Sequence, residues 1–189
     1  MGFLDALLGG GRKLKGPAPD RLFAITSAQV TLETALDIKH KDVAGIVFQP
    51  IASGDFQTII KEAEELVRAM AEEHETSMHS ADDEFGYRWL VLRDSDFDDL
   101  VVSLNTISTE LQGGGYGDRL LACVFAFEEK GSQLYLIYNF KRGSFYPFVP
   151  SGKKSRDSER ELRLKSQLDT ELPIEADMSR WFPLWEIPL

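Results

Sequence analysis

The sequence has few of the features on which extracellular stability, membrane insertion or nucleic-acid binding depend. It contains a single cysteine, Cys123, which excludes a disulfide within the chain and is typical of a reducing compartment such as the cytoplasm. No apolar run approaches the roughly 18 residues that a membrane-spanning helix needs. Basic residues are also scarce, with 21 Lys and Arg against 31 Asp and Glu, and this deficit argues against a nucleic-acid partner.

The remaining composition is that of an ordinary globular protein. The chain has 189 residues, of which 43% are hydrophobic and 28% charged, enough for one domain whose core needs neither disulfides nor metal. The net charge of −10 is unevenly distributed. Residues 1–20 carry three cations and two acids, so their net charge is +1 and the rest of the chain carries −11.

The first 15 residues combine an apolar stretch with a basic cluster. Residues 1–8 predict a short helix, and residues 9–19, rich in Gly and Pro, predict a flexible linker. The residues concerned are Phe3, Leu4, Leu7 and Leu8 on one side of the helix and Arg12, Lys13 and Lys15 behind it. This order suits peripheral contact with an anionic membrane, and it equally suits a terminus that packs weakly on its own domain or on a neighbour. It does not suit a secretion signal, in which the charges come first.

The pattern of apolar residues between positions 20 and 115 predicts alternating helices and strands. In chain order we expect two short helices over 20–36 with a break near Thr26 and Ser27, a strand over 43–51, an amphipathic helix over 56–70, a strand over 85–93 and a helix from Ser95 to the glycines at 113–115. Ser95 and Asp98 resemble a helix-capping pair. The polar segment between 72 and 84 predicts a solvated loop.

The second half of the chain predicts the rest of the sheet and one more helix. We expect strands over 119–128 and 133–140 joined at Lys130 and Gly131, an edge strand over 145–150, and a helix that carries Leu164, Leu168 and Leu172 behind a capping box of Ser158 and Glu161. The apolar tail, residues 181–189, is expected to seal the core of its own domain, with docking to a partner as the alternative. Residues 20–189 thus predict a single domain that contains both helices and strands.

None of the common catalytic arrangements fits the sequence. The glycines at 113–117 follow a helix and precede a strand, the reverse of a phosphate-binding loop. Asp94, Asp96 and Asp98 lack the glycine and glutamate that complete a calcium loop. Cys123 lies in an apolar strand, where a thiol is inert. We therefore expect no catalytic residue, no cofactor and no enzymatic activity.

A second hypothesis keeps an enzyme open. The histidines at 74 and 79 and the acids at 82–84 are the only cluster with the residue types of a metal site, although the spacing of the histidines does not place them on one helix face. A metal-dependent or small-molecule enzyme would use Glu72, His74, His79 and Asp82. The solvated-loop interpretation is favoured, and it assigns no metal ligands.

The two ends of the chain resemble a known family. The start MGFLDALLGG, the segment DRLFAITSAQVTLETALDIKHKDVAGIVFQP and the closing WFPLWEIPL are similar to PspAB, the PspA-associated protein of actinobacteria and archaea. The resemblance implies a cytoplasmic accessory of the phage-shock envelope-stress system, with a PspA-family protein or related components as its partner.

A more remote likeness concerns the fold. The helix LVVSLNTISTELQGGGYGDRL, with Asn105 near its middle and a hairpin after it, is similar to YbjN-like proteins and type III secretion chaperones. This likeness implies a single α+β domain, an antiparallel sheet with helices packed on one face. It also implies that the protein is often dimeric and that it binds proteins rather than catalysing a reaction. A general chaperone-like module that binds apolar segments is therefore a third hypothesis.

Overall fold

The computed structural model describes residues 19–74 and 76–189. The segment that carries Phe3, Leu4, Leu7, Leu8, Arg12, Lys13 and Lys15 lies outside the described residues. Both interpretations of that segment therefore stay predictions.

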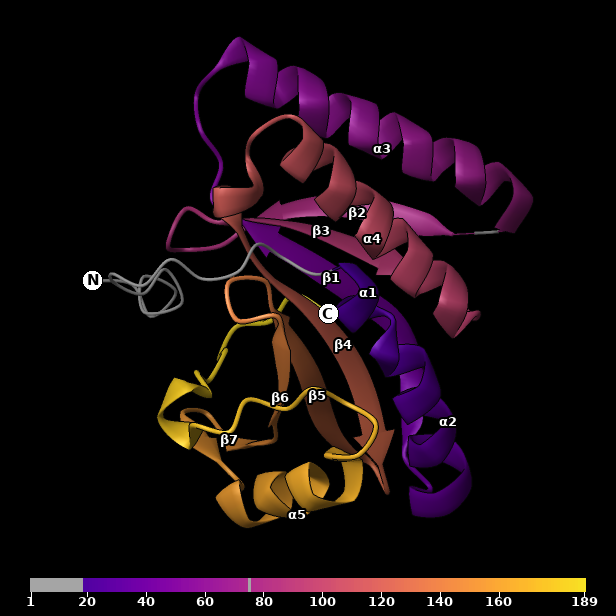
Figure 1. Cartoon of the computed structure of the whole chain (residues 1–189), viewed down its shortest axis with the longest axis vertical. Coiled ribbons are helices and arrows are strands. Elements are labelled where there is room, and N and C mark those ends of the chain that lie inside the picture. The colour runs from indigo at the N-terminus through magenta and orange to yellow at the C-terminus, as the bar shows by residue number, and fades with distance from the viewer. Residues whose placement is uncertain (1–18, 75) are drawn as a thin grey trace.

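The centre of the molecule is a six-stranded antiparallel sheet in the order β2-β3-β1-β4-β5-β6 (Figure 1). Its strands are β1 (Lys39–Phe48), β2 (Ser77–Asp82), β3 (Arg88–Arg93), β4 (Leu120–Glu129), β5 (Ser132–Asn139) and β6 (Ser144–Phe148). The predicted turn between β4 and β5 is confirmed, because Lys130 and Gly131 both adopt the positive φ angles that a tight hairpin requires. A small hairpin of β7 (Pro150–Gly152) and β8 (Ser155–Arg156) follows the edge strand β6.

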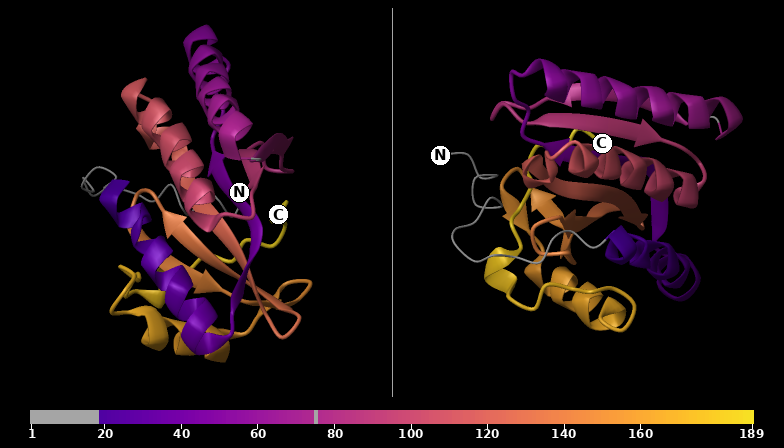
Figure 2. Two further views of the ribbon diagram at one scale, coloured as in Figure 1. Left: turned by 90° about the vertical axis from the view of Figure 1, so that its right-hand side faces the viewer. Right: turned by 45° about the horizontal axis from the view of Figure 1, so that its top comes forward.

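The helices cover one face of this sheet, as predicted. They are α1 (Pro19–Leu22), α2 (Ala24–Leu36), α3 (Gly54–His74), α4 (Phe97–Gly113) and α5 (Ser158–Leu168). In the views of Figures 1 and 2, α4 lies between α3 and the α1–α2 pair. The helix α4 buries an apolar stripe, namely Phe97, Leu100, Val101, Leu104, Ile107 and Leu111. Leu164 and Leu168 of α5 join the same core.

The opposite face of the sheet is buried as well, and the C-terminal tail contributes to its cover. Trp181 and Leu184 are 3% and 5% exposed and pack with Val47, Trp89 and Tyr146 of the sheet. The prediction that the tail seals its own domain is therefore confirmed. Burial on both faces also explains why the strands are almost continuously apolar, because neither alternate set of side chains meets water.

Two predictions about local structure were wrong. The segment expected to be a solvated loop contains β2, which pairs with β3 from Ser77 to Asp82 and forms the edge of the sheet. Its residues are polar because only one neighbour pairs with it and most of its side chains stay exposed. The first helical region is interrupted at Phe23 rather than at Thr26 and Ser27.

Both predicted helix caps were also displaced by one residue. The N-cap of α4 is Asp96, whose side chain accepts hydrogen bonds from the backbone of Asp98 and Asp99, and not Ser95. The N-cap of α5 is Asp157, which accepts from the Arg160 backbone, and not Ser158. An aspartate satisfies the free N–H groups of a first turn as well as serine does, and its charge also interacts favourably with the helix dipole.

None of the described helices has the length and hydropathy of a membrane span.

Candidate interaction site

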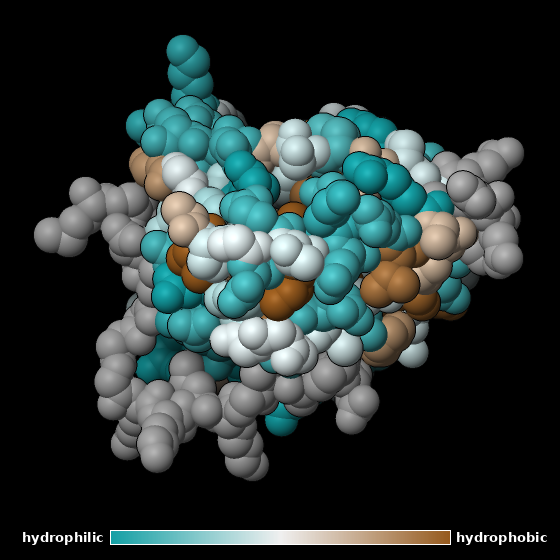
Figure 3. Space-filling model, turned by 90° about the horizontal axis from the view of Figure 1, so that it is seen from above, coloured by the Kyte–Doolittle hydropathy of each residue, from teal (hydrophilic) through white to brown (hydrophobic). Residues whose placement is uncertain are grey.

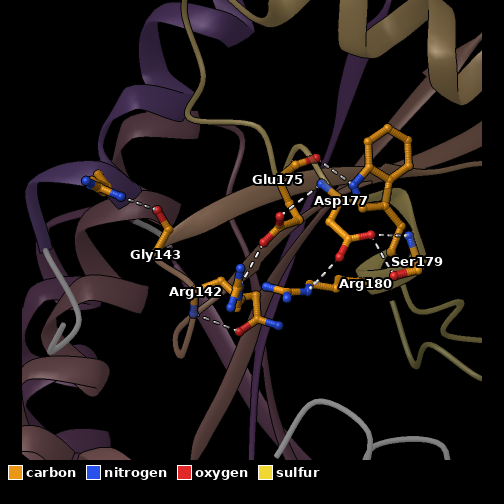
Figure 4. Close-up of polar contacts among 9 residues, drawn as sticks. Arg142, Gly143, Glu175, Asp177, Ser179 and Arg180 are labelled. Atoms are coloured by element: carbon orange, nitrogen blue, oxygen red, sulfur yellow. Dashed lines mark hydrogen bonds and ion pairs between the residues drawn. The ribbon is translucent and has the colours of Figure 1, made fainter. Parts of the chain in front are cut away.

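The C-terminal segment is fixed to the domain by a polar network around Glu175 (Figure 4). Arg142, in the turn between β5 and β6, donates from Nε to the Glu175 carboxylate at 2.8 Å. The indole N–H of Trp181 donates to the backbone carbonyl of Glu175 at 2.9 Å, and the Asp177 backbone N–H donates to its carboxylate at 3.0 Å. Glu175 is only 9% exposed, so loss of these bonds, two of which are charge-assisted through its carboxylate, would be costly.

The next turn of the segment is a short 3-10 helix, η3 (Met178–Arg180), capped by Asp177. The Asp177 carboxylate accepts from the backbone N–H and the hydroxyl of Ser179 and forms an ion pair with Arg180 at 2.9 Å (Figure 4). The hydrogen bonds from Ser179 hold the pKa of Asp177 below its usual value. The contacts of Glu175 and Asp177 therefore hold η3, from which the tail begins, in place on the domain.

A second anchor joins the tail to α5. Arg156, in β8, donates from Nη1 to the carbonyl of Trp181 at 2.6 Å and from Nε to the Glu161 carboxylate at 2.8 and 2.9 Å. Glu161 is 1% exposed and also accepts from the backbone N–H of Val149 at 2.8 Å. Burial raises the pKa of Glu161, and the hydrogen bond from Arg156 opposes that effect. Glu161 thus serves as a buried junction and not as the predicted cap.

From Trp181 onward the tail crosses the second face of the sheet. The ring of Trp185 contacts the ring of Phe148 edge to face, with centroids 5.4 Å apart. At the end of the chain, Leu189 packs next to Gly45 in β1. The tail therefore reaches from the edge strand β6 to the middle of the sheet.

An open groove separates the tail from the turn between β2 and β3. It has a volume of about 70 Å³, and an adjoining hollow extends it along β2. The apolar part of its lining comes from Phe85, Trp89, Leu184 and Trp185. Charged residues complete it, namely Asp83, Glu84, Glu186 and Lys154, with Asp82 in the adjoining hollow.

Asp83 organises the turn that forms one wall of the groove. One carboxylate oxygen accepts from the backbone N–H groups of Phe85 and Tyr87, both at 2.9 Å, and the other accepts from the indole of Trp89 at 3.2 Å. Gly86 provides the positive φ of 81° that the turn requires. The wall is therefore held in place before any ligand arrives. Phe85, at the tip of the turn, remains 49% exposed.

The face seen over α3 and α4 is mainly hydrophilic, with a few hydrophobic areas among the described residues (Figure 3). Leu66 and Val102 are 45% and 38% exposed there, but single exposed apolar residues are normal on a soluble domain. Ion pairs between residues four apart, such as Arg68 with Glu64, account for much of the polar face of α3.

The structure does not gather the residues of the metal hypothesis that it describes. His79 and Asp82 are three residues apart in β2 and thus project to opposite sides of the strand, and Asp82 is paired with Arg88 at 2.8 Å. The side chains of Glu72 and His74 lie outside the described residues. Among residues 21–70 and 76–189, whose side chains the structure describes, no group of three or more His, Cys, Asp or Glu is placed to hold a metal ion.

The other candidates from the sequence occupy structural positions. Cys123 is fully buried in β4, and burial raises the pKa of its thiol well above the usual value, which supports the expectation of an inert thiol. Gly114 caps the end of α4 through a bond from its N–H to the carbonyl of Glu110. Asp94 and Asp96 accept backbone hydrogen bonds at the start of α4.

The groove was not predicted from the sequence, because its walls are about 100 residues apart in the chain. A partial signal was present in the acidic run at 82–84 and in the acid within the aromatic tail, Glu186. Nothing in the sequence indicated that these two segments meet.

Of the comparisons with known proteins, the one with protein-family models found a match. No curated protein and no solved structure matched the chain, so the likeness to YbjN-like proteins and secretion chaperones stays a prediction from sequence. A family model described as PspAB, PspA associated protein B, matches residues 1–189. Because the match spans the whole sequence, the chain belongs to the PspAB family.

Proposed function

We propose that this protein is a non-catalytic, protein-binding accessory of a PspA-linked envelope-stress response. The observation that carries the proposal is the match of the whole chain to the PspAB family. The polar clusters add support, because Glu161, Glu175 and Asp83 all accept hydrogen bonds that hold the tail or the turn beside it. These groups position a surface and are not arranged around a reacting centre.

The experiment is affinity capture with the tagged full-length chain in extract of its native cells, followed by identification of the captured proteins. The proposal expects a PspA-family protein as the dominant partner. A broad set of unrelated clients would instead favour the chaperone-like module, and capture of neither would contradict both. Light scattering on the purified chain tests whether it also forms a homodimer, as the likeness to secretion chaperones implies.

The proposed location is the cytoplasm, with peripheral contact at the inner face of the membrane through residues 1–15. The sequence pattern supports this, because Phe3, Leu4, Leu7 and Leu8 can enter the headgroup region while Arg12, Lys13 and Lys15 meet anionic lipid. The body of the protein, with its charge of −11, is repelled by the same lipid. Contact should therefore be confined to this basic segment.

Co-sedimentation with anionic vesicles tests the membrane contact. We expect the full-length chain to partition into the pellet and a variant with Arg12, Lys13 and Lys15 all replaced by Gln to remain in solution. A variant with Lys61 replaced by Gln, on the exposed face of α3, is the control and should partition like the wild type. Equal partitioning of wild type and the triple variant would remove the support for an electrostatic anchor.

A further inference from the structure

We propose that the groove between the β2–β3 turn and the C-terminal tail binds a lysine or arginine side chain of a partner protein. The inference rests on the proposed protein-binding role and specifies the chemistry of the partner. Three features of the groove support it, namely aromatic residues in the walls, acidic residues on the rim and a shape that exists before binding.

The walls of the groove fit the stem and head of a long basic side chain. Trp185, Leu184 and Trp89 are among its lining residues, although Trp89 is only 2% exposed, so methylene groups can pack on apolar surface. Aromatic faces also attract a cation that lies within about 6 Å of the ring centre. Phe85 stands at the entrance and is 49% exposed, which gives the residues next to the bound cation an apolar contact.

The charges around the groove select a cation. Glu84 and Glu186 are exposed on its rim, and among the described residues neither forms an ion pair. Asp83 and Asp82 add negative charge, although Asp83 is engaged in the turn and Asp82 is paired with Arg88. Lys154 is the one basic residue among the described residues of the lining. The acids therefore dominate, and an anionic ligand would meet repulsion.

The groove needs little rearrangement to bind. Asp83 already fixes the Trp89 indole and the turn, and the tail is fixed at Trp181 through Glu175 and Arg156. A site that is ordered before binding avoids the entropy cost of ordering it with the ligand. Because its walls are already ordered, the open groove can serve as a docking surface for a side chain that projects from a partner protein.

Two peptides provide the probe. One is acetylated and amidated Gly-Leu-Arg-Gly-Leu-Arg-Gly, and the other has glutamine in place of both arginines. Binding to the full-length chain is followed by NMR through the three indole N–H signals, which Trp→Phe variants assign. We expect the arginine peptide to shift the signals of Trp89 and Trp185 and to leave that of Trp181 unchanged, because Trp89 and Trp185 line the groove and Trp181 is not among its described lining residues.

Charge variants test the role of the acidic rim. Glu186→Gln and Glu84→Gln should each weaken binding of the arginine peptide about two- to fivefold, whereas Lys154→Gln should strengthen it by a similar factor. Glu62→Gln, an exposed acid on α3, is the matched control and should have no effect. Equal binding of the two peptides, or affinities that these rim variants do not change, would overturn the inference.

The same variants separate this inference from the proposed function. Peptide binding without capture of a PspA-family protein would support the groove and contradict the PspA-linked role. A second outcome is that the chain captures the PspA-family protein, does not bind the arginine peptide, and captures the protein equally well as Glu186→Lys. This outcome would support the PspA-linked role and overturn the groove as a cation site.

Discussion

Gly45 and Leu189 meet near the middle of the sheet, although they are far apart in the sequence. A Cβ atom at position 45 would lie 3.0 Å from Cδ2 of Leu189 and 3.5 Å from the Trp89 ring. The missing side chain of Gly45 thus lets the end of the chain approach the sheet and places the tail beside Trp89, in the wall of the groove. A glycine inside a strand often marks such a close approach.

Replacement of Gly45 by Val should displace the tail. The added methyl groups would meet Leu189 and Trp89, and overpacking of this kind costs about 1–3 kcal/mol. We expect a lower free energy of unfolding in urea, a red shift in tryptophan emission and faster proteolysis within residues 181–189. Gly54→Val is the control, because a Cβ there meets nothing within 4 Å. Identical behaviour of the two variants would contradict the packing of Leu189 on Gly45.

The ion pair between Arg156 and Glu161 should be far more important for stability than an exposed pair. Arg156→Met leaves a carboxylate that is 1% exposed with only the Val149 N–H as a donor, and breaking a buried pair in this way costs about 3–5 kcal/mol. Urea unfolding measures the loss. The double variant Arg156→Met, Glu161→Gln should recover part of it, because no buried charge then remains.

The control for this pair lies on the same helix. Arg163 and Glu159 are 2.8 Å apart but are exposed, so Arg163→Met should cost less than about 1 kcal/mol. If Arg156→Met lowered the free energy of unfolding as little as Arg163→Met, Arg156 would not be the anchor that joins α5 to the tail.

Tyr146→Phe should stabilise the protein. Tyr146 is 1% exposed, and its hydroxyl has no hydrogen-bond partner in the described part of the chain. A buried polar group without a partner is unfavourable, so we expect the free energy of unfolding to rise by about 1 kcal/mol. Tyr135→Phe, on the same face of the sheet, should change it by less than about 0.5 kcal/mol. A clear destabilisation by Tyr146→Phe would show that the hydroxyl is bonded after all.

The stability of the protein should fall at alkaline pH, in part through Tyr146. Burial raises its pKa above the value near 10 that the unfolded chain has, so above pH 10 the unfolded state loses this proton first. The contribution is complete below pH 10 and decreases by up to about 1.4 kcal/mol per pH unit above it. Burial also raises the pKa of Tyr135 to about 12, which adds to the trend. Urea unfolding between pH 9 and 11 should show a smaller slope for Tyr146→Phe than for wild type, and equal slopes would exclude the effect.

The N-cap of α4 can be tested directly, because the structure assigns it to Asp96 and the sequence pattern indicates Ser95. Asp96→Ala removes the acceptor for the Asp98 and Asp99 N–H groups and should cost about 1 kcal/mol. Ser95→Ala should cost almost nothing, although the sequence pattern indicated Ser95 as the cap. Thermal unfolding of the two variants distinguishes the assignments, and a larger loss for Ser95→Ala would restore the sequence-based one.

The elements that could be predicted are those whose own residues carry a complete pattern. The helix α4 has an apolar residue at every three or four positions from Phe97 to Leu111, and the β4–β5 hairpin has apolar strands around Lys130 and Gly131. The strand β2 has no such pattern, because Ser77–Asp82 forms an edge strand and depends on pairing with β3. The formation of β2 therefore depends on pairing with β3 and not on the β-propensity of its own residues.

The site depends on long-range packing to a greater extent. An apolar tail was predicted to cover its own core, but its path was fixed by Arg142, Arg156 and Gly45, each from a different part of the chain. The acidic run at 82–84 was interpreted as a solvated loop because its partner wall, Trp185 and Glu186, lies at the other end of the sequence. Hydrophobic periodicity contains no information on such contacts.

Titration calorimetry of the purified full-length chain with a purified PspA-family protein from the same source tests the proposed role without intermediaries. We expect direct binding that Glu186→Lys weakens, because the substitution reverses a charge on the rim of the groove, and that Lys154→Gln strengthens. Glu62→Lys, on α3, should leave the affinity unchanged. Absence of any binding to the PspA-family protein would contradict the central claim that this chain is a PspA-binding accessory.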